Sequence, residues 1–408
     1  MKEVFIITSG EILSGRTAGA RRMLNIARSL AHGNVIVNLC SLAEFNGKYS
    51  ERLLIQPGIY SISVRDSSGQ QRSDLTLFLR SIYRYMKEND QKPVVFLYPT
   101  TFVFRDFIYL VYFKFLKRLK IFCDINELRT AIAFSASPPE GILSALVYYL
   151  KSTRDYVVYK LSEIQAIFYD GIIVISESLE NYFSRYNRKM IRVPILCDSN
   201  QIKTERTLQD FNEDVFRICF AGYIKIEKEG FDLLLEALSA VSQTHHVELY
   251  LYGMLENRDH SRLEQLSVKN GLTESIHYKG NIPPGDLQDE FMKYHLLILP
   301  RPLNKRTKYG FSTKLSEYLV SGRPVLMTDV SDNARYFKDN YNSYLIPPGS
   351  AETMRDKILY IIMNYNDQAK AIVENAYRTV REELDYKLFS AAYIEFLFGN
   401  DENSRKIA

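Results

Sequence analysis

Few cysteines and no long uncharged apolar stretch narrow the classes of protein that this sequence can encode. Its four cysteines, among 408 residues, form no C-x-x-C pair, and most lie in apolar runs typical of strands. A disulfide framework or zinc site is therefore not expected, and a reducing cytoplasm is the default. No apolar run approaches the ~20 residues of a spanning helix, and MKEVFIITSG at the start indicates a strand rather than a signal peptide. We expect a soluble chain.

A large excess of charge is also missing, as are the short motifs of metal and hydrolase sites. With 52 Lys and Arg against 48 Asp and Glu, the net charge is +4, too small to indicate nucleic acid as the main partner. The six histidines show no H-E-x-x-H spacing, and there is no Asp-x-Asp pair and no G-x-S-x-G elbow. We expect no metal ion and no other cofactor.

Short apolar runs alternate with helical patterns twice along the chain, which is typical of parallel sheets with helices on both faces. In the first half we expect a helix over 18–33 and strands at Val4–Thr8, Val35–Leu39, Val94–Tyr98, Ile121–Ile125 and Gly171–Ile175. In the second half we expect helices at Phe231–Val241 and Ser261–Asn270 and strands at Val215–Phe220, Val247–Tyr252, Ile276–Tyr278, Leu296–Leu299, Pro324–Met327 and Tyr344–Ile346. The prediction is an α/β protein with two Rossmann-like, doubly wound domains that face a central cleft.

The alternation stops at the polar stretch 198–214, which we predict to be the linker between the domains. The first domain would then span residues 1–197 and the second residues 215–380. Residues 381–408 are predicted to form a C-terminal helix that packs back across the domains. The last helical patterns, which have no strand partners, are Ala351–Asn364, Asp367–Glu383 and Tyr386–Leu397. We expect them to pack on the outside.

The segment after the first strand, GEILSGRT, has the glycine spacing of a P-loop. Arg16 stands where that loop requires Lys, and a planar guanidinium is a poor substitute for a compact ammonium. The alternative is a turn whose glycines permit positive φ. Gly15 and Gly19 would then let the backbone approach a ligand beside a helix N-terminus. An NTPase would instead show Mg-dependent ATP binding that is lost on changing Arg16.

Cations follow two of the strands in the second half. Lys225 and Lys228 lie in the loop after the first of these strands, and Arg301 opens a basic loop after another. Cations at the carboxyl ends of parallel strands suit an anionic ligand. As isolated residues, the lysines would equally be solvated loop side chains.

The basic loop leads into an expected helix whose N-cap would be Ser312 or Thr313. Free amides at that helix start would be able to hold phosphate oxygens. Glu317 lies one turn into the helix, where an ordinary role would be an ion pair with Lys314.

The blocks FAGYIKIEKEGFDLLLEAL, LPRP and GFSTKLSEYLVSGRPV, in this order, closely resemble retaining GT-B glycosyltransferases of glycosyltransferase family four. The likeness is strongest over about residues 216–348. In the first half, AGARRMLNIARSLAHGNVIV is similar to that family's opening, and GIIVISESLENYF is similar to the segment before its interdomain linker. The resemblance implies the GT-B fold, with the acceptor side in the first domain and the nucleotide sugar in the second.

The resemblance also implies a set of site residues. Lys228 would contact the donor diphosphate, Glu317 would bind the ribose hydroxyls, and Arg301 or Lys314 would supply a second cation because Tyr223 stands where the family often has Arg. The implied donor-binding positions are Gly15, Gly19, Gly222, Gly253, Asn281, Tyr309, Gly310, Phe311, Ser312 and Thr313. The acceptor-side candidates are Asn126, Glu127 and Arg129, in a segment that often carries a histidine.

The function implied is retaining, metal-independent transfer of a sugar from a UDP- or GDP-sugar to a hydroxyl of a growing glycan, either a polysaccharide or a lipid-linked oligosaccharide. Two alternatives stay open, a nucleotide-sugar epimerase of the same fold and a non-catalytic nucleotide-sugar binding protein. Tyr309, Tyr223 and Asn126, which depart from the family pattern, keep the binding protein in consideration.

The stretch Phe104–Phe122 combines aromatic residues with a basic end at 114–120. It is either a helix lying on an anionic membrane surface or an ordinary crossover helix. A peripheral contact of this kind would place a cytoplasmic protein at the inner face of the plasma membrane.

Overall fold

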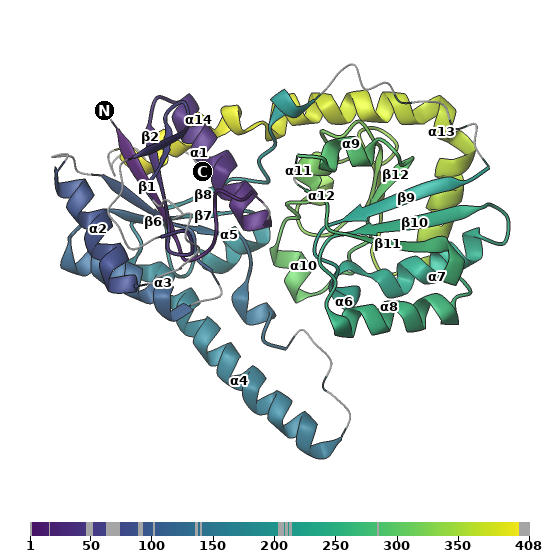
Figure 1. Ribbon diagram of the computed structural model, residues 1–408, viewed down its shortest axis with the longest axis horizontal. Helices are drawn as coiled ribbons and strands as arrows, with labels where there is room; N and C mark the ends of the chain where they lie inside the picture. The colour runs from purple at the N-terminus through teal and green to yellow at the C-terminus, as the bar shows by residue number, and fades with distance from the viewer. Residues whose placement is uncertain are drawn as a thin grey trace. The chain divides into compact units, whose positions relative to one another are not determined.

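The computed structural model describes residues 2–15, 17–45, 52–62, 74–88, 93–100, 103–134, 138, 141–202, 208, 211, 214–283 and 285–399. The chain divides into two compact units (Figure 1), with boundaries between Leu196 and Cys197 and between Asp385 and Tyr386. The second unit is thus one continuous stretch, and the chain returns to the first unit after Asp385. The predicted cleft between the domains stays a prediction.

The first unit is built on a largely parallel sheet of order β3-β4-β2-β1-β5-β6-β7-β8, in which only the edge strand β3 is antiparallel to its neighbour. The strands are β1 Glu3–Thr8, β2 Ile36–Ser41, β3 Leu53–Gln56, β4 Ile59–Ser61, β5 Val94–Leu97, β6 Ile121–Ile125, β7 Gly171–Val174 and β8 Met190–Arg192. The order reverses between β1 and β5, which are neighbours in the sheet. Ligands of doubly wound sheets bind beyond such a reversal.

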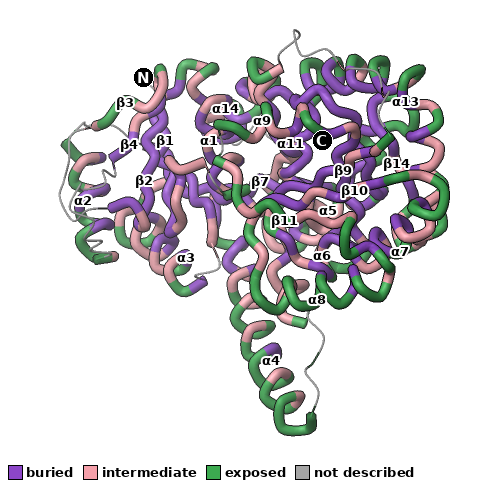
Figure 2. The backbone as a smooth tube through the Cα atoms, turned by 45° about the vertical axis from the view of Figure 1, so that its right-hand side comes forward, coloured by how far each residue is buried: buried purple, intermediate pink, exposed green. Residues whose placement is uncertain are grey.

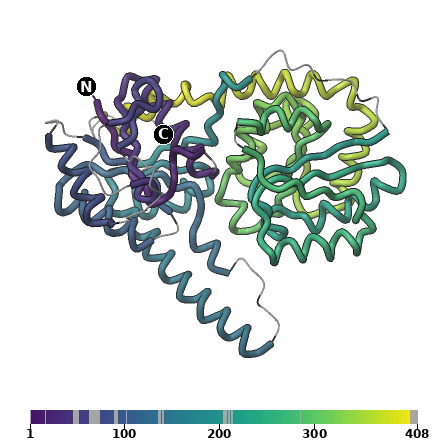
Figure 3. Tube along the Cα trace, in the orientation of Figure 1, coloured from purple at the N-terminus to yellow at the C-terminus, as the bar shows by residue number. Residues whose placement is uncertain are grey.

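Helices surround this sheet and include the end of the chain. They are α1 Ala18–His32, α2 Leu75–Glu88, α3 Val103–Leu110, the π-helix η1 Val111–Leu116, the 3₁₀ turns η2 Arg129–Ala131, η3 Gln165–Phe168 and η7 Tyr386–Phe389, and α4 Ile142–Ile164, α5 Glu177–Phe183 and α14 Ser390–Phe398. Figure 3 shows α14 beside α1, and the Phe396 ring meets Phe122 of β6 at 5.3 Å between centroids. The last helix therefore completes the core of the first unit.

The second unit is built on a parallel sheet of order β11-β10-β9-β12-β13-β14. Its strands are β9 Phe216–Ala221, β10 Val247–Tyr252, β11 Ile276–Gly280, β12 Leu296–Leu299, β13 Val325–Thr328 and β14 Tyr344–Ile346. Its helical elements are η4 Ser199–Gln201, α6 Ile226–Glu229, α7 Phe231–Val241, α8 Asn257–Lys269, η5 Thr273–Ser275, α9 Leu287–Phe291, α10 Lys305–Tyr309, α11 Leu315–Tyr318, α12 Asn333–Tyr336, α13 Ala351–Thr379 and the π-helix η6 Val380–Leu384. The order reverses between β9 and β12.

The strands that were predicted agree with the observed ones to within about two residues because central parallel strands are covered on both faces and read as continuous apolar runs. The strands β3, β4 and β8 were not predicted. Figure 2 shows the buried strands at the centre of each unit. One terminal prediction is wrong: the expected break near 365–366 does not occur, and α13 runs unbroken from Ala351 to Thr379. Tyr365 is buried and donates to the His295 carbonyl, so the helix stays packed against the second unit at the residues where a break was expected.

Among the described residues, no helix is both long enough and apolar enough to span a bilayer. The stretch Phe104–Phe122 is not one helix. Its helical part ends at Leu116, and Ile121 begins the buried strand β6. The expected long surface helix is therefore shorter than the residue pattern indicated.

Candidate active site

The reversal point of the second sheet brings together two segments that lie far apart in the sequence. β9 and β12 are neighbours, with Leu297 paired to Cys219. The chain leaves β9 toward α6, which carries Lys228 and Glu229, and it leaves β12 directly into Pro300 and Arg301. Side chains beyond two adjacent carboxyl ends meet at one edge of the sheet, so these residues converge.

A glycine makes the close approach of these segments possible. Gly230 links α6 to α7 with a left-handed backbone, φ +79°. A Cβ at this position would lie 2.1 Å from the Pro300 carbonyl oxygen, so no other residue fits without a shift of the backbone. The K-E-G sequence thus places Glu229 directly against the end of β12.

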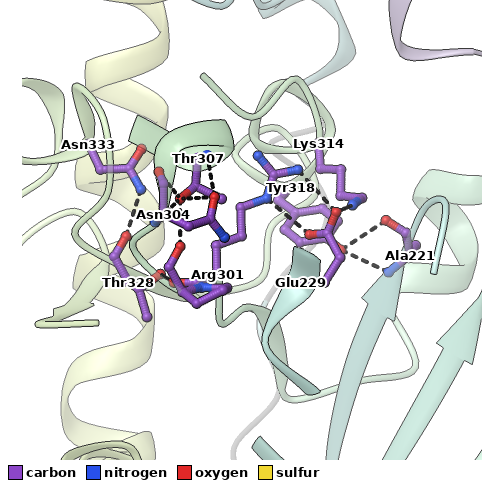
Figure 4. A network of polar contacts seen from close by, with 10 residues as sticks. Ala221, Glu229, Arg301, Asn304, Thr307, Lys314, Tyr318, Thr328 and Asn333 are labelled. Carbon is purple, nitrogen blue, oxygen red and sulfur yellow. Dashed lines mark hydrogen bonds and ion pairs between the residues drawn. The ribbon is translucent and has the colours of Figure 1, made fainter. Parts of the chain in front are cut away.

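The carboxylate of Glu229 lies at the centre of a buried polar cluster (Figure 4). Arg301 donates to it from Nε at 3.0 Å and from Nη2 at 3.2 Å, and the Lys314 ammonium lies 2.7 Å from Oε1. Sequence reasoning did not select Glu229. The available signal was a carboxylate directly before the glycine that must approach another strand.

The protonation behaviour of the cluster reflects crowded positive charge. Burial lowers the pKa of Lys228 to about 7, and Arg301 and Arg306 act in the same direction. Burial also lowers the pKa of Lys314 to about 8, although Glu229 opposes this shift. For Glu229, burial would raise the pKa, but Arg301 and Lys314 hold it well below its ordinary range. The carboxylate is therefore ionised, and the two lysines lose protons more easily than lysines in water.

Positive charge exceeds negative charge at this site. Four basic residues shift the pKa of Lys228 or Glu229 or carry such a shifted pKa themselves: Arg301, Arg306, Lys314 and Lys228. The single carboxylate of Glu229 can neutralise the charge of one of them. Glu317 acts on Lys314 from the next turn. A buried cluster with this imbalance has the electrostatics of an anion site, since an anion would restore the charge of Lys228.

Two buried polar atoms near the cluster make no hydrogen bond within the described part of the chain: Ser312 Oγ and Arg306 Nε. Buried polar groups are almost always paired in folded proteins. A hydroxyl and a guanidinium N–H beside a cationic cluster can both donate to oxygens of an anionic ligand. Ser312, a predicted site residue, lies two residues before Lys314, which contacts Glu229.

The local structure around Ser312 corrects the predicted start of the following helix and its predicted N-cap. The expected helix beginning at Ser312 or Thr313 is only the short α11, Leu315–Tyr318; its cap is Lys314, which makes no side-chain capping bond. Tyr318 donates to the Ala221 carbonyl at 3.1 Å and accepts from the Ala221 amide at 2.8 Å, which ties α11 to the end of β9.

The expected basic loop after Arg301 is partly helical. Lys305–Tyr309 form α10 because the Asn304 side chain accepts from the Thr307 amide while Thr307 Oγ1 accepts from the Asn304 amide. This reciprocal cap stabilises a helix start in a segment that otherwise looks like loop. It also fixes the position of Arg306.

Lys225 and Lys228, equivalent in the sequence, have different surroundings. Lys225 forms ion pairs with Glu256 at 2.6 Å and Asp259 at 3.0 Å. Of the two lysines that were expected to bind an anion, only Lys228 therefore stays a candidate. Lys314 forms its ion pair with Glu229, although the charge of Glu317 also acts on it. The Glu317 backbone carbonyl accepts from the Gln288 side chain at 3.0 Å.

The other predicted donor positions surround the same edge. A Cβ on Gly222, φ +143°, would lie 2.1 Å from Lys314 Cε, and a Cβ on Gly253, φ +116°, would lie 2.0 Å from the Gly222 carbonyl oxygen. Asn281 is exposed after β11. Phe311 is buried and stacks on Tyr336 at 5.7 Å, so its side chain belongs to the core. The remaining positions are half-buried: Tyr309 ends α10, and Gly310 and Thr313 lie between α10 and α11.

In the first unit, predicted residues gather where the strand order reverses. Gly19 lies against Tyr98, which follows β5; a Cβ on it would be 3.2 Å from that ring. Asn126, after β6, donates to the Tyr98 hydroxyl at 2.5 Å. Gly15 has φ +59°. Arg16 lies outside the described residues, but the Glu44 carboxylate accepts from the amides of Ile12 and Leu13. A carboxylate on these amides disfavours the P-loop alternative.

Arg129 and Glu127 differ in their surroundings. Arg129 donates to Asp106 at 3.2 Å and to Ser162 at 3.1 Å, so its charge is already engaged. Burial raises the pKa of Asp106 to about 7, although Arg129 opposes the shift. Glu127 is half-buried after β6.

Across the described ranges of both units, His, Cys, Asp and Glu form no group of three or more that could hold a metal ion.

Comparison with protein families identifies the domain around this cluster. Residues 215–364 match the family described as glycosyl transferases group 1. The chain is also 24% identical over 225 residues to a poly(ribitol-phosphate) alpha-N-acetylglucosaminyltransferase of Staphylococcus aureus, a match that covers 52% of this chain and 40% of the relative. The match therefore spans less than half the length of that relative.

Solved structures share the whole architecture. Sucrose-phosphate synthase from Thermosynechococcus elongatus superposes with a TM-score of 0.69 at 14% identity and covers 96% of this chain and 97% of its own. TarM has a TM-score of 0.67 at 12% identity, with 98% and 99% covered. Anabaena HepE, solved with UDP-glucose, has a TM-score of 0.63 at 15% identity, with 97% and 99% covered. At such low identities the likeness shows the fold.

Proposed function

We propose that this GT-B chain is a glycosyltransferase of the group 1 type, which moves a sugar from a UDP- or GDP-sugar to a hydroxyl of a growing glycan. The observation that carries this proposal is the excess of positive charge around Glu229 at the reversal point of the second sheet. A nucleoside diphosphate is the anion that leaves in such a reaction, and in this proposal Lys228, Arg306 and Ser312 bind it.

The reaction breaks the bond between the anomeric carbon and the β-phosphate oxygen and forms a bond from that carbon to the acceptor oxygen. The electron pair of the broken bond stays on the phosphate, where negative charge grows. Fixed cations stabilise that charge without reorganisation. The acceptor proton moves to the leaving phosphate on the same face of the sugar, so the anomeric configuration is retained. In this proposal the cations do the work that a metal ion does elsewhere.

Support for the donor and acceptor comes from similar proteins. HepE was solved with UDP and with UDP-glucose. The Staphylococcus aureus relative is named for transfer of N-acetylglucosamine to poly(ribitol-phosphate), which is a polymer carrying hydroxyl groups. We extend both properties to this chain as a proposal: a nucleotide-sugar donor, and a polymeric or lipid-linked glycan acceptor.

A thermal-shift panel of UDP- and GDP-sugars tests the assignment. We expect one donor series to raise the melting temperature, with the nucleoside diphosphate giving part of the shift, because a ligand that binds only the folded state stabilises it by mass action. EDTA should leave the shift unchanged. The stabilising donor should then lose its sugar in the presence of acceptor glycans. No shift with any donor, or an epimerised sugar released without acceptor, would contradict the proposal.

The low pKa of Lys228, about 7, predicts a pH-dependent affinity for UDP or GDP. Below pH 7 this lysine is already protonated. Above pH 7 the free protein must take up a proton on binding, since the diphosphate favours the charged lysine. The Kd should therefore rise with pH above about 7, by up to about tenfold per pH unit.

Calorimetry in buffers of different protonation enthalpy measures this proton uptake directly. The Lys228→Arg variant is the matched control, because a guanidinium stays protonated over the whole range. The rise in Kd should flatten in this variant. Equal pH dependence in both proteins would assign the effect to other groups.

A further inference from the structure

The helix α4 of the first unit exposes an unusual amount of apolar surface. At its start, the relative exposures are 93% for Ile142, 75% for Leu143, 54% for Leu146, 58% for Val147 and 65% for Leu150. Figures 1 and 2 show this helix extending away from the body of the first unit, with exposed residues along much of its length. We name residues Ile142–Leu150 the α4 tip. A large exposed apolar patch usually marks an interaction site.

The distribution of these residues around the helix distinguishes a lipid layer from a partner helix. Neighbouring residues are exposed in pairs, Ile142 with Leu143 and Leu146 with Val147. At 100° per residue, the five exposed apolar side chains named above span an arc of about 140°. A second helix covers only a narrow stripe. A wide apolar arc is better covered by an environment that surrounds the helix, such as the acyl region of a lipid layer.

The charges support the same environment. From Gly141 to Leu150 the chain carries no charged residue on any face of the helix. The first charged residues that follow are basic, Lys151 and Arg154, and both are exposed. Tyr148 and Tyr149 precede them. An uncharged tip followed by aromatic and basic residues matches the order of acyl chains, interface and phosphate headgroups.

The segment Phe104–Phe122 is a weaker candidate for contact with a membrane surface than α4. Phe104 and Leu116 are exposed, but two of the four basic residues at 114–120 are engaged: Lys114 forms an ion pair with Asp170 at 2.5 Å, and Lys117 lies 4.3 Å from the centre of the Tyr83 ring. From Ile121 onward the chain is in the sheet.

We propose that the α4 tip inserts into the surface of a phospholipid membrane. Only the tip enters the lipid, and the helix does not cross the bilayer, which agrees with the lack of a spanning helix in the described chain. The inference rests on α4 and does not depend on the proposed sugar transfer.

The chain contains no tryptophan, so a single introduced indole reports its own environment. Leu146→Trp places it in the α4 tip, and Val268→Trp places it on α8 of the second unit at a position that is 69% exposed. With phosphatidylcholine and phosphatidylglycerol vesicles, we expect a blue shift and quenching by brominated acyl chains for Leu146→Trp only. The absence of both effects would overturn the proposal.

A charge reversal provides the second measurement. The double variant Leu143→Glu/Leu150→Glu should weaken vesicle binding at least about tenfold, since each glutamate removes apolar area from the lipid and adds a charge that lipid disfavours. Val268→Glu is the matched control and should bind like the unmodified chain. All replaced side chains are exposed, so melting temperatures should not change. A blue shift of Leu146→Trp that depends on protein concentration without lipid would show self-association and refute lipid as the occupant.

Discussion

Replacing Lys228 with alanine is expected to lower the rate of sugar transfer by about 10²–10³, the loss seen when one preorganised group that stabilises developing negative charge is removed. Lys228 is the lysine of α6 whose charge is suppressed by burial and by Arg301 and Arg306. The diphosphate of the bound donor restores that charge before the bond breaks, so a full positive charge faces the phosphate as its negative charge grows. The measurement is initial-rate kinetics with the donor that the thermal-shift panel selects.

Lys225→Ala is the control for this experiment. Lys225 lies on the same loop but is held by Glu256 and Asp259, so its removal should change the rate by less than a few-fold. Both variants should melt near the temperature of the unmodified protein. Equal losses in the two variants, or full activity of Lys228→Ala, would contradict the assignment of Lys228 to the diphosphate.

Replacing Glu229 with glutamine is expected to destabilise the second unit by about 3–5 kcal/mol, the usual cost of removing one partner of a buried ion pair. Glutamine keeps the volume and part of the hydrogen bonding but leaves Arg301 and Lys314 without their carboxylate. For a unit of this size, such a loss corresponds to a fall in melting temperature of about 6–20 °C. Calorimetry on the whole chain measures it.

Glu227→Gln, an exposed change on the same short helix, should shift the melting temperature by no more than about 2 °C because surface substitutions rarely exceed ±0.5 kcal/mol. Pyrophosphate should recover part of the stability lost in Glu229→Gln, since an anion can take the place of the missing charge. A melting temperature unchanged by Glu229→Gln would show that the cluster is hydrated and not held by its carboxylate.

Residue patterns were sufficient where structure follows from short-range periodicity. The strands Ile121–Ile125 and Leu296–Leu299 and the helix Phe231–Val241 have the predicted bounds, because their apolar spacing is set by burial on one face or two. The patterns failed where a few polar contacts decide the outcome. The cap formed by Asn304 and Thr307 produced α10, and the bonds of Tyr318 to Ala221 set the position of the short α11.

The sequence by itself determined that two Rossmann-like sheets are present and that Lys228, Arg301 and Lys314 follow or lie near strand ends, since periodicity and punctuation are local properties. Only the tertiary structure decided which charges meet. It selected Lys228 over Lys225, joined Arg301 and Lys314 through Glu229, and left the α4 tip uncovered. The physical reason is that burial and Coulomb energy depend on distances between residues far apart in the chain, and these distances are set when β9 pairs with β12.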